Sequence, residues 1–226
     1  MKEGRDETVN DSHEQAGHES AGEVPLLGLS ADELLMTTRT VRRRLDLTRP
    51  VPRAVIRRAV EIAVQAPTGG NRAGWRWIVV DDPALRAEVG RVWSECAEGY
   101  LRHVPADDRM LPGARHLQRI IGSVPALVIP VIEGRPPERD LSWTASFWGS
   151  ILPAMWSFML ALRARGLGGA WTQVHLRREQ EMAELLGIPH GEVTQAGLVP
   201  VAWTVGTTFK PARREPVEEI LHWNEW

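Results

Sequence analysis

The chain has 226 residues, of which 43% are hydrophobic and 25% charged, and its formal net charge at pH 7 is -2. These values are typical of a soluble globular protein with one compact domain, and the near-neutral balance argues against nucleic acid as the main partner. No apolar run approaches the roughly 20 residues needed to cross a bilayer. We therefore expect a cytoplasmic protein without a membrane partner.

Cysteine and histidine usage narrows the possible chemistry. The single Cys96 has no partner for an internal disulfide and no cysteine or histidine neighbours of the kind that zinc needs. The seven histidines show no pair at metal-ligand spacing, and the chain has neither a P-loop nor a Gly-x-Ser-x-Gly nucleophile elbow. We expect no metal and no catalytic side chain, so an enzyme built on this chain would depend on a cofactor.

The first predicted elements follow a polar N-terminal segment. Residues 1–29 have few large apolar side chains, which predicts a disordered tail before a single domain over residues 30–226. Ser30 is placed to cap a short helix through Met36, with Glu33 completing a capping box.

The middle of the chain alternates between helical and strand patterns. Apolar residues recur at helical spacing from Val55 to Ala66, and this helix must end at Pro67. We expect a strand over Trp75–Val80, a helix from Pro83 to about Tyr100, and a loop with a further helix between Pro105 and Ile121.

The second half contains the most apolar segments. Val124–Ile132 predicts a strand buried on both faces, and Trp143–Arg165 a long central helix covered by other elements or a second subunit. The glycine-rich segment from Gly166 to Gly169 should end that helix. The remaining predicted elements are a short strand through Val174, a helix from Arg177 to Leu186 and a strand over Gly197–Val205. Together these elements predict an α+β or α/β sandwich.

Two segments are candidates for binding a cofactor. Arg39-Thr40-Val41-Arg42-Arg43-Arg44 suits a phosphate, because guanidinium groups match its oxygens and the hydroxyl adds a donor. Ala66-Pro67-Thr68-Gly69-Gly70-Asn71 allows close backbone approach and places an amide beside a polar ring edge. Taken alone, the first segment also fits a solvated basic face and the second an ordinary turn.

Two later segments are equally ambiguous by themselves. The run from Gly166 to Thr172 ends a helix instead of opening one, so it is not a dinucleotide fingerprint and its default interpretation is a helix cap. Lys210 to Arg214 supplies cations that either complete a phosphate site or remain in water.

In this order, the four segments resemble the FMN-dependent nitroreductase family, which typically shows Arg-Ser-x-Arg followed by Ala-Pro-Ser-x-x-Asn-x-Gln-Pro-Trp. The resemblance covers residues 31–226 and includes a Leu-Gly-Ile-Pro step at Leu186–Pro189. It implies a three-layer α/β/α sandwich with a central, mostly antiparallel sheet, a long central dimer helix and an exchanged C-terminal extension. It also implies a homodimer with FMN at the subunit interface.

Carried over by position, the resemblance implies a set of FMN contacts. The phosphate and ribityl chain would be held by Arg39, Thr40, Arg42 and Arg43, with Lys210 or Arg214 reaching the phosphate from the C-terminus. The flavin ring would be contacted by Asn71, by the segment Thr172, Gln173 and Val174 near N5, and by Ser146, Gly149 and Ser150 of the second subunit.

The sequence departs from the family pattern in several places. Ala73-Gly74 stands where the family has Gln-Pro, which removes one expected glutamine contact, and Thr40 replaces a serine but keeps its hydroxyl. Arg72 follows Asn71, and its neighbourhood makes it a candidate contact for substrate or the NAD(P)H phosphate.

The function implied is hydride transfer from NAD(P)H through flavin N5 to a small, electron-poor aromatic acceptor, either a nitroaromatic or a quinone. Trp148 and Trp171 are candidates for sandwiching it, although most tryptophans are expected in the core or the interface. Two alternatives stay open. One is a flavin-sequestering or redox-sensing protein whose flavin face is covered by residues 100–118, and the other is a tailoring flavoenzyme of a biosynthetic pathway.

Overall fold

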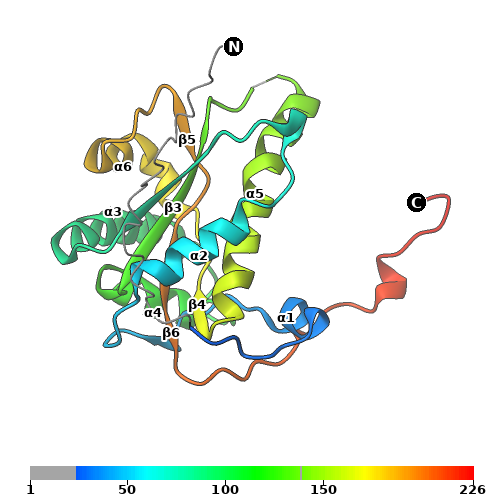
Figure 1. The fold of residues 1–226 in the computed structure, drawn as a ribbon, viewed down its shortest axis with the longest axis horizontal. Coiled ribbons are helices and arrows are strands. Elements are labelled where there is room, and N and C mark those ends of the chain that lie inside the picture. The colour runs from blue at the N-terminus through cyan, green and yellow to red at the C-terminus, as the bar shows by residue number, and fades with distance from the viewer. Residues whose placement is uncertain (1–23, 138) are drawn as a thin grey trace, which may run out of the picture.

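The computed structural model describes residues 24–137 and 139–226 (Figure 1). The α-helices are α1 Ala31–Thr37, α2 Arg53–Ala63, α3 Pro83–Leu101, α4 Leu111–Ile120, α5 Leu141–Arg163 and α6 Glu179–Leu186. The strands are β1 Leu45–Asp46, β2 Trp75–Val80, β3 Ala126–Glu133, β4 Leu167–Gly169, β5 Val193–Gln195 and β6 Val199–Thr204. Short 3-10 helices include η1 Gly69–Asn71, η3 Val174–Arg178 and η4 Val217–Glu219.

The strands form one sheet in the order β1-β6-β3-β2, with β4 beside β6 and β5 beside β3. Every pairing between these named strands is antiparallel. The expected antiparallel sheet is therefore confirmed, and the strand predicted at residues 75–80 has the predicted bounds. The strands β1 and β5 were not predicted, because two or three residues are too few to show an alternating pattern.

Helices cover both faces of the sheet, which makes three layers (Figure 1). Along β3, Ala126 and Val128 belong to the core shared with α2 and α5, whereas Leu127, Ile129 and Val131 belong to the core beneath α3, α4 and α6. This alternation follows from the two-residue period of a strand. The predicted α/β/α sandwich is confirmed, and the strand is buried on both faces as expected.

The helix starts follow their capping residues. Ser30 and Glu33 make the predicted reciprocal capping box. Asp82 accepts a hydrogen bond from the amide of Leu85 at the start of α3, whose first residue is Pro83. Asp140 caps α5 in the same way through the amide of Trp143, so this helix begins two residues before the predicted start.

The glycine run after α5 corrects the predicted order of elements. Gly166 has a φ of +77° and ends the helix, but residues 167–169 themselves form the strand that was expected farther along, up to Val174. Side chains would not fit there: a Cβ on Gly168 would lie 2.9 Å from Val41 Cγ2, and one on Gly169 would lie 2.6 Å from Val199 Cγ1. The glycines therefore serve close packing as well as the helix end.

The segment after this strand also differs from the prediction. Residues 174–178 form η3, and the α-helix begins at Glu179 instead of Arg177. Its C-terminus at Leu186 is as predicted, followed by Gly187 in the left-handed conformation that commonly closes a helix.

The two ends of the chain extend beyond the sandwich. Most of the predicted N-terminal tail lies outside the described residues, but Leu27 donates its amide to the carbonyl of Ala164 at 2.8 Å, so the packed chain begins before residue 30. Residues 205–226 form a largely exposed C-terminal arm that leaves the body and ends at a distance from it (Figure 1). This is the predicted C-terminal extension; its exchange with a second subunit remains a prediction.

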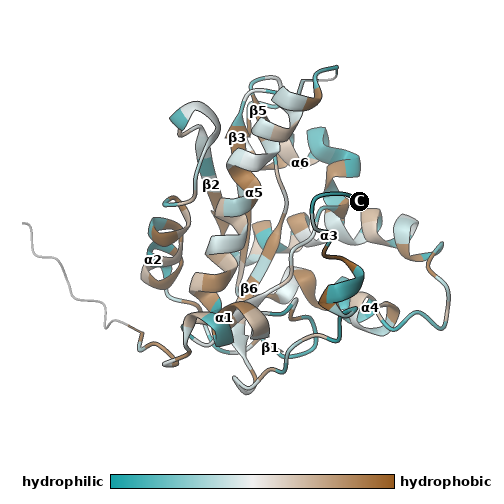
Figure 2. Cartoon of the chain, turned by 90° about the vertical axis from the view of Figure 1, so that its right-hand side faces the viewer, coloured by the Kyte–Doolittle hydropathy of each residue, from teal (hydrophilic) through white to brown (hydrophobic). Residues whose placement is uncertain are grey.

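Helix α5 is apolar along nearly its whole length (Figure 2). By length and hydropathy alone it could cross a membrane, and 44% of its most apolar window is buried inside the described structure. Core helices of soluble proteins show the same properties, and α5 packs against α2, β3 and β4. A cytoplasmic location without a membrane partner remains the prediction from the sequence.

Candidate active site

The main candidate site is a cavity of about 560 Å³ on the α3–α4 side of the sheet. Four segments form it: Arg42 in the segment before β1, the C-terminal half of α3, the helix α4 with the residue before it, and the chain from Trp171 into η3. Its lining residues are Arg42, Trp93, Ala97, Tyr100, Leu101, Met110, Ala114, Leu117, Trp171, Thr172, Gln173, Val174 and Arg177. Four predicted site residues, Arg42 and 172–174, therefore meet in one cavity whose size suits a small-molecule ligand.

Arg42 is the most unusual charge in this cavity. Its side chain is half-buried and makes no hydrogen bond or ion pair with any described residue. Burial lowers the pKa of its guanidinium, an effect that Tyr100 partly opposes. A partly desolvated cation without a partner is costly. Arg42 therefore favours a ligand that brings negative charge or acceptor oxygens into the cavity.

The backbone amides from Thr172 to Val174 differ in whether they have a hydrogen-bond acceptor within the described structure. The backbone of Thr172 pairs with Leu198 at 3.1 and 2.8 Å, and its hydroxyl donates to the Leu198 carbonyl while accepting from Trp93 Nε1 at 3.0 Å. The amides of Gln173 and Val174 donate to no part of the chain that the structure describes. The expected backbone donor to a ligand is thus available at these two residues and is already used at Thr172.

The N-terminal arginine segment lies against the strand that leads into this cavity. Thr40 forms a bridge with Gly169, and the Val41 amide donates to the Gly169 carbonyl at 2.8 Å. Arg39 donates through Nε and Nη2 to the carbonyl of Lys210 at 3.1 and 3.0 Å, which joins two basic segments 171 residues apart.

The other predicted cations lie farther out. Arg43 is exposed and does not line the cavity, and Arg214 is exposed on the C-terminal arm. Neither makes a hydrogen bond or ion pair within the described ranges. Their assignment to a phosphate remains a prediction.

The remaining predicted residues form a separate group on α5 and η1. The amide of Gly69 donates to Ser150 Oγ at 2.8 Å, and a Cβ on Gly69 would collide with Ser146 Oγ, so η1 packs directly on α5. Asn71 ends η1 with a φ of +53° and an exposed side chain, and Gly149 is exposed with open space around it. Asn71 and the Ser146 region thus belong to one patch, distinct from the lining of the main cavity.

A smaller cavity of about 360 Å³ lies beside this patch. Ser146 and Ser150 line it, and so do Arg72 and the Ala73-Gly74 step that departs from the family pattern. Arg72 is therefore near the patch and does not line the main cavity.

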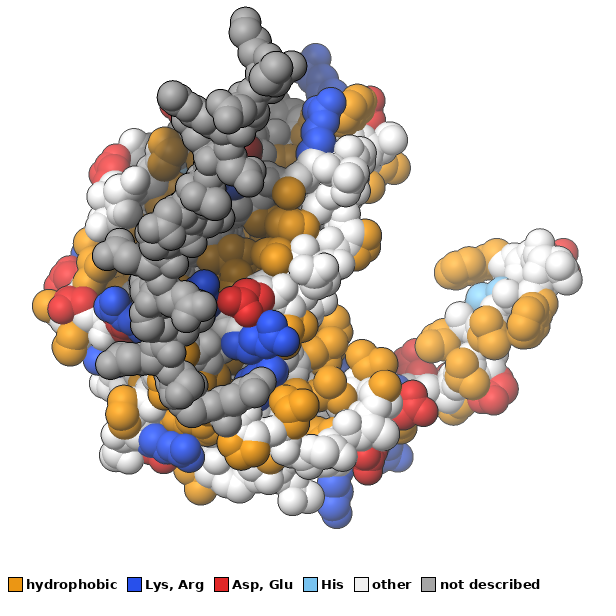
Figure 3. Space-filling model, viewed as in Figure 1, with side chains coloured by type: hydrophobic (Ala, Val, Ile, Leu, Met, Phe, Trp, Pro, Cys, Tyr) orange, Lys and Arg blue, Asp and Glu red, His pale blue; other side chains and the backbone are white. Residues whose placement is uncertain are grey.

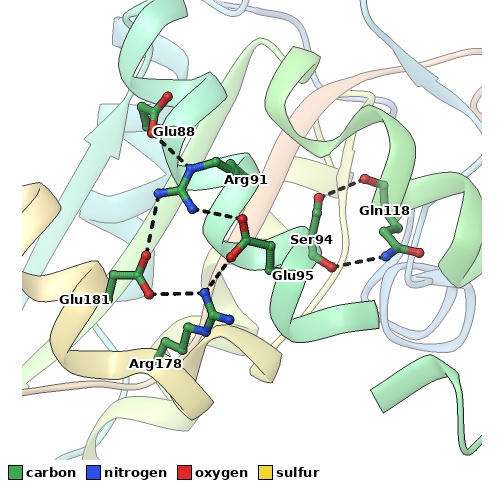
Figure 4. Close-up of polar contacts among 7 residues, drawn as sticks. All are labelled: Glu88, Arg91, Ser94, Glu95, Gln118, Arg178 and Glu181. Carbon is green, nitrogen blue, oxygen red and sulfur yellow. Dashed lines mark hydrogen bonds and ion pairs between the residues drawn. The ribbon is translucent and has the colours of Figure 1, made fainter. Parts of the chain in front are cut away.

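Polar contacts hold the walls of the main cavity in place (Figure 4). Arg178 Nη1 joins η3 to α3 by donating to Glu95 Oε2 at 2.5 Å, and Arg91 on α3 lies 2.9 Å from the same carboxylate. Between α3 and α4, Ser94 Oγ donates to the Gln118 carbonyl at 2.9 Å, and Gln118 Nε2 donates to the Ser94 carbonyl at 3.1 Å. Both α4 and η3 are thus fastened to α3.

A buried histidine, His175, directly follows Gln173 and Val174 in the sequence and was not predicted as part of a site. His175 is fully buried, and neither ring nitrogen has a hydrogen-bond partner within the described structure. Burial lowers its pKa to about 4, against the opposing influence of Glu179 and Gln195. Glu179 accepts from Arg135 and from the Gln195 amide, which lower its pKa although burial acts to raise it.

Sequence analysis also missed most of the cavity lining, including Tyr100, Met110 and Arg177. Tyr100 and Met110 come from the end of α3 and the loop before α4, and Arg177 comes from η3. The segment of residues 100–118 was recognised as a possible cover, but no pattern indicated which of its side chains turn inward. Arg177 was assigned only to a helix start, where basic residues carry no specific signal.

Comparison with known proteins identifies the family. The model of the nitroreductase family matches residues 35–203. A protein of Thermus thermophilus named NADH dehydrogenase is 26% identical to this chain, over 89% of this chain and 99% of the relative.

Solved structures show the same fold. Iodotyrosine deiodinase bound to FMN and 3-iodo-L-tyrosine has a TM-score of 0.67 at 22% identity, covering 85% of this chain and 98% of that one. A variant of the FMN and NADPH-dependent nitroreductase NfnB from a Sphigopyxis strain has a TM-score of 0.67 at 19% identity, covering 88% and 100%. With most of its length matched by the family model and its sandwich shared with these structures, the chain belongs to the nitroreductase family.

Proposed function

We propose that the protein is an FMN-dependent oxidoreductase that uses NAD(P)H to reduce a small, electron-poor aromatic acceptor, either a nitroaromatic or a quinone. The observation that carries this proposal is the main cavity, which is lined by Arg42, Gln173 and Val174. Among the described residues, Arg42 has no ion-pair or hydrogen-bond partner and the amides of Gln173 and Val174 have no acceptor. Membership of the nitroreductase family supports the same reaction class.

The residues present fit the chemistry of FMN. The cofactor supplies hydride acceptance and donation at flavin N5, for which the protein needs only to bind, orient and polarise. The amides of Gln173 and Val174 are positioned to donate hydrogen bonds to ring acceptors, and Arg42 to stabilise negative charge on the reduced ring or its side chain. Arg39 and Thr40, with Lys210 or Arg214, are the proposed phosphate ligands.

We further propose that a second copy of the chain completes this site. Asn71, Ser146 and Gly149 form an exposed patch outside the main cavity, and α5 carries no charged residue before Arg163. Hydrophobic side chains gather on the α5 side of the body and along the C-terminal arm (Figure 3). An apolar surface of this kind favours a homodimer in which Asn71 reaches the flavin together with Ser146, from the partner.

The relatives support the cofactor and donor in this proposal. Structures with this fold include a protein bound to FMN and an FMN and NADPH-dependent nitroreductase, and the Thermus relative is named for NADH. Tyr100, Gln173 and Arg177 are exposed at the edge of the cavity, so a second ligand can approach it from solvent. This opening favours an enzyme over a protein that only sequesters flavin.

The direct test is an absorption spectrum of the purified protein, recorded anaerobically before and after NADH or NADPH is added in separate cuvettes. We expect flavin bands that bleach with at least one nicotinamide and return when a nitroaromatic or quinone is added. Bands that persist with both donors would favour sequestration. A colourless protein that takes up no added FMN would contradict the proposal.

A further inference from the structure

Two adjacent arginines in η3 have different surroundings. Arg178 contacts Glu95 at 2.5 Å and Glu181 at 3.3 Å, so its charge is fully engaged in the ionic network of Figure 4. Arg177 forms no ion pair or hydrogen bond within the described ranges, and its guanidinium carbon lies 5.9 Å from the centre of the Tyr100 ring. Both Arg177 and Tyr100 line the main cavity.

The charges around this cavity are unbalanced. Arg42 and Arg177 line it, and none of its described lining residues is acidic. The nearby carboxylates on the same helices already contact other cations: Glu98 binds Arg115, and Glu95 binds Arg91 and Arg178. The cavity therefore presents uncompensated positive charge to any ligand that enters it.

The two cavity arginines differ in depth. Arg42 is half-buried, whereas Arg177 is exposed at the edge beside Tyr100. Under the proposed function, Arg42 serves the flavin. Arg177 lacks such a role, and its position suits the molecule that arrives second.

We propose that Arg177, held over Tyr100, binds an oxyanion of the molecule that exchanges electrons with the flavin, and so selects anionic ligands. This inference rests on the proposed function. The oxyanion is either the carboxylate of an aromatic acceptor or the 2′-phosphate of NADPH. A guanidinium binds both, because its planar fork matches paired oxygens, and the Tyr100 ring beneath it limits its orientations.

The test compares four ligands that form two matched pairs. They are 4-nitrobenzoate with its neutral analogue 4-nitrobenzamide, and NADP⁺ with NAD⁺, which lacks the 2′-phosphate. Dissociation constants are measured by calorimetry on the flavin-loaded protein, which needs no turnover. The variants are Arg177→Gln, Arg177→Lys and the control Arg57→Gln on the opposite helical layer, where the side chain is 78% exposed, each checked for folding by its melting temperature.

We expect Arg177→Gln to weaken binding of the anionic member of one pair by about tenfold, the usual effect of losing one charge-assisted hydrogen bond. The neutral member should be unaffected, Arg177→Lys should retain part of the preference, and Arg57→Gln should leave it unchanged. The affected pair identifies the source of the oxyanion. Equal losses for charged and neutral ligands, equal losses in both arginine variants, or no loss at all would overturn the proposal.

Failure of this inference is distinguishable from failure of the proposed function. A protein that binds FMN and is reduced by a nicotinamide, but shows no Arg177-dependent anion preference, keeps the function and loses the inference. A protein that takes up no FMN loses both.

Discussion

The two helical layers of this molecule differ in how far their surfaces are paired or covered by other parts of the same chain. On one face, α3, α4 and η3 are joined by ion pairs and hydrogen bonds and line a cavity in which Arg42 has no ion-pair or hydrogen-bond partner among the described residues. On the other face, α5 leaves Trp143, Ser146, Gly149 and Trp156 exposed on a helix without charge before Arg163, and the C-terminal arm leaves the body.

This difference underlies the proposed division of the binding site between two copies of the chain. The face tied together by polar contacts can hold a ligand in a fixed cavity, because its walls do not depend on another molecule. The α5 face carries the remaining predicted contacts, and its exposed apolar surface needs a cover. A second copy would supply that cover and bring the second group of contacts to the first.

The largest expected effect comes from a charge placed on the α5 face. Gly149→Arg should not disturb the isolated chain, because no atom lies within 4 Å of a Cβ built at that position. In a dimer the charge would be buried without a partner, which we expect to weaken association by about 3 kcal/mol, or about a hundredfold. Analytical ultracentrifugation should show monomers, and FMN retention should fall with them.

The matched control is Gly191→Arg. This glycine also has open space around it, but lies in the loop between α6 and β5. It should leave both the mass and the flavin content unchanged. If Gly149→Arg stays dimeric with its FMN bound, the partner surface lies elsewhere.

Substitution of Arg42 tests the part of the proposed FMN site that lies within one chain, the main cavity. Arg42→Gln removes the half-buried cation, and FMN affinity should fall by about ten- to a hundredfold through the loss of charge-assisted contacts. The measurement is a flavin fluorescence titration of the apoprotein. Arg57→Gln on the opposite helical layer, where the side chain is 78% exposed, is the control with the same charge change. Equal affinities in the two variants would remove Arg42 from the site.

The pH dependence of the free energy of unfolding tests the burial of His175, which directly follows Gln173 and Val174 in the sequence. Because burial lowers its pKa from 6.5 to about 4, the unfolded chain takes up a proton between these values and the folded chain does not. The free energy of unfolding should therefore fall as the pH decreases, by about 1.4 kcal/mol per pH unit and by about 3 kcal/mol in all.

Urea unfolding between pH 6.5 and 4.5 measures this effect. His175→Leu should flatten the decline in this interval, where carboxylates with lowered pKa values such as that of Glu179 still remain ionised. His222→Gln, an exposed histidine on the C-terminal arm, should leave the profile unchanged. An unaltered slope in His175→Leu would show that its ring is not buried in the neutral form.

The smallest effect is expected where α3 meets α4. Gln118→Ala removes the hydrogen bonds that Gln118 Nε2 donates to the Ser94 carbonyl and to Glu98, and the one that Gln118 Oε1 accepts from Arg115. It should lower the free energy of unfolding by about 1 kcal/mol. Gln180→Ala on the exposed surface of α6 is the control and should have less effect. Equal effects in thermal unfolding would show that the contact between α3 and α4 contributes little.

Much of the fold was predictable, because local patterns specify the long elements. The strand at 75–80, the helix opened by Pro83 and the buried strand near 126–133 follow from periodicity and capping residues. The strand at 167–169 was misassigned because glycine signals a turn, whereas here it allows close packing against Val41 and Val199.

The site was predictable only in part, for a related reason. Arg42 and residues 172–174 meet in the cavity as expected, but Tyr100 and Arg177 are brought there by tertiary packing that no local pattern encodes. The sequence also does not show that Asn71 lies with Ser146, since this depends on η1 packing against α5 through Gly69.

The central claim, that FMN is bound between two copies of the chain, is tested most directly by sedimentation velocity followed at the visible flavin absorption band. The account predicts that flavin absorbance sediments with a species of twice the 25.3 kDa chain mass, and is lost from the monomers of Gly149→Arg. Flavin that sediments with a 25.3 kDa monomer, or that stays bound when Gly149→Arg separates the copies, would contradict it.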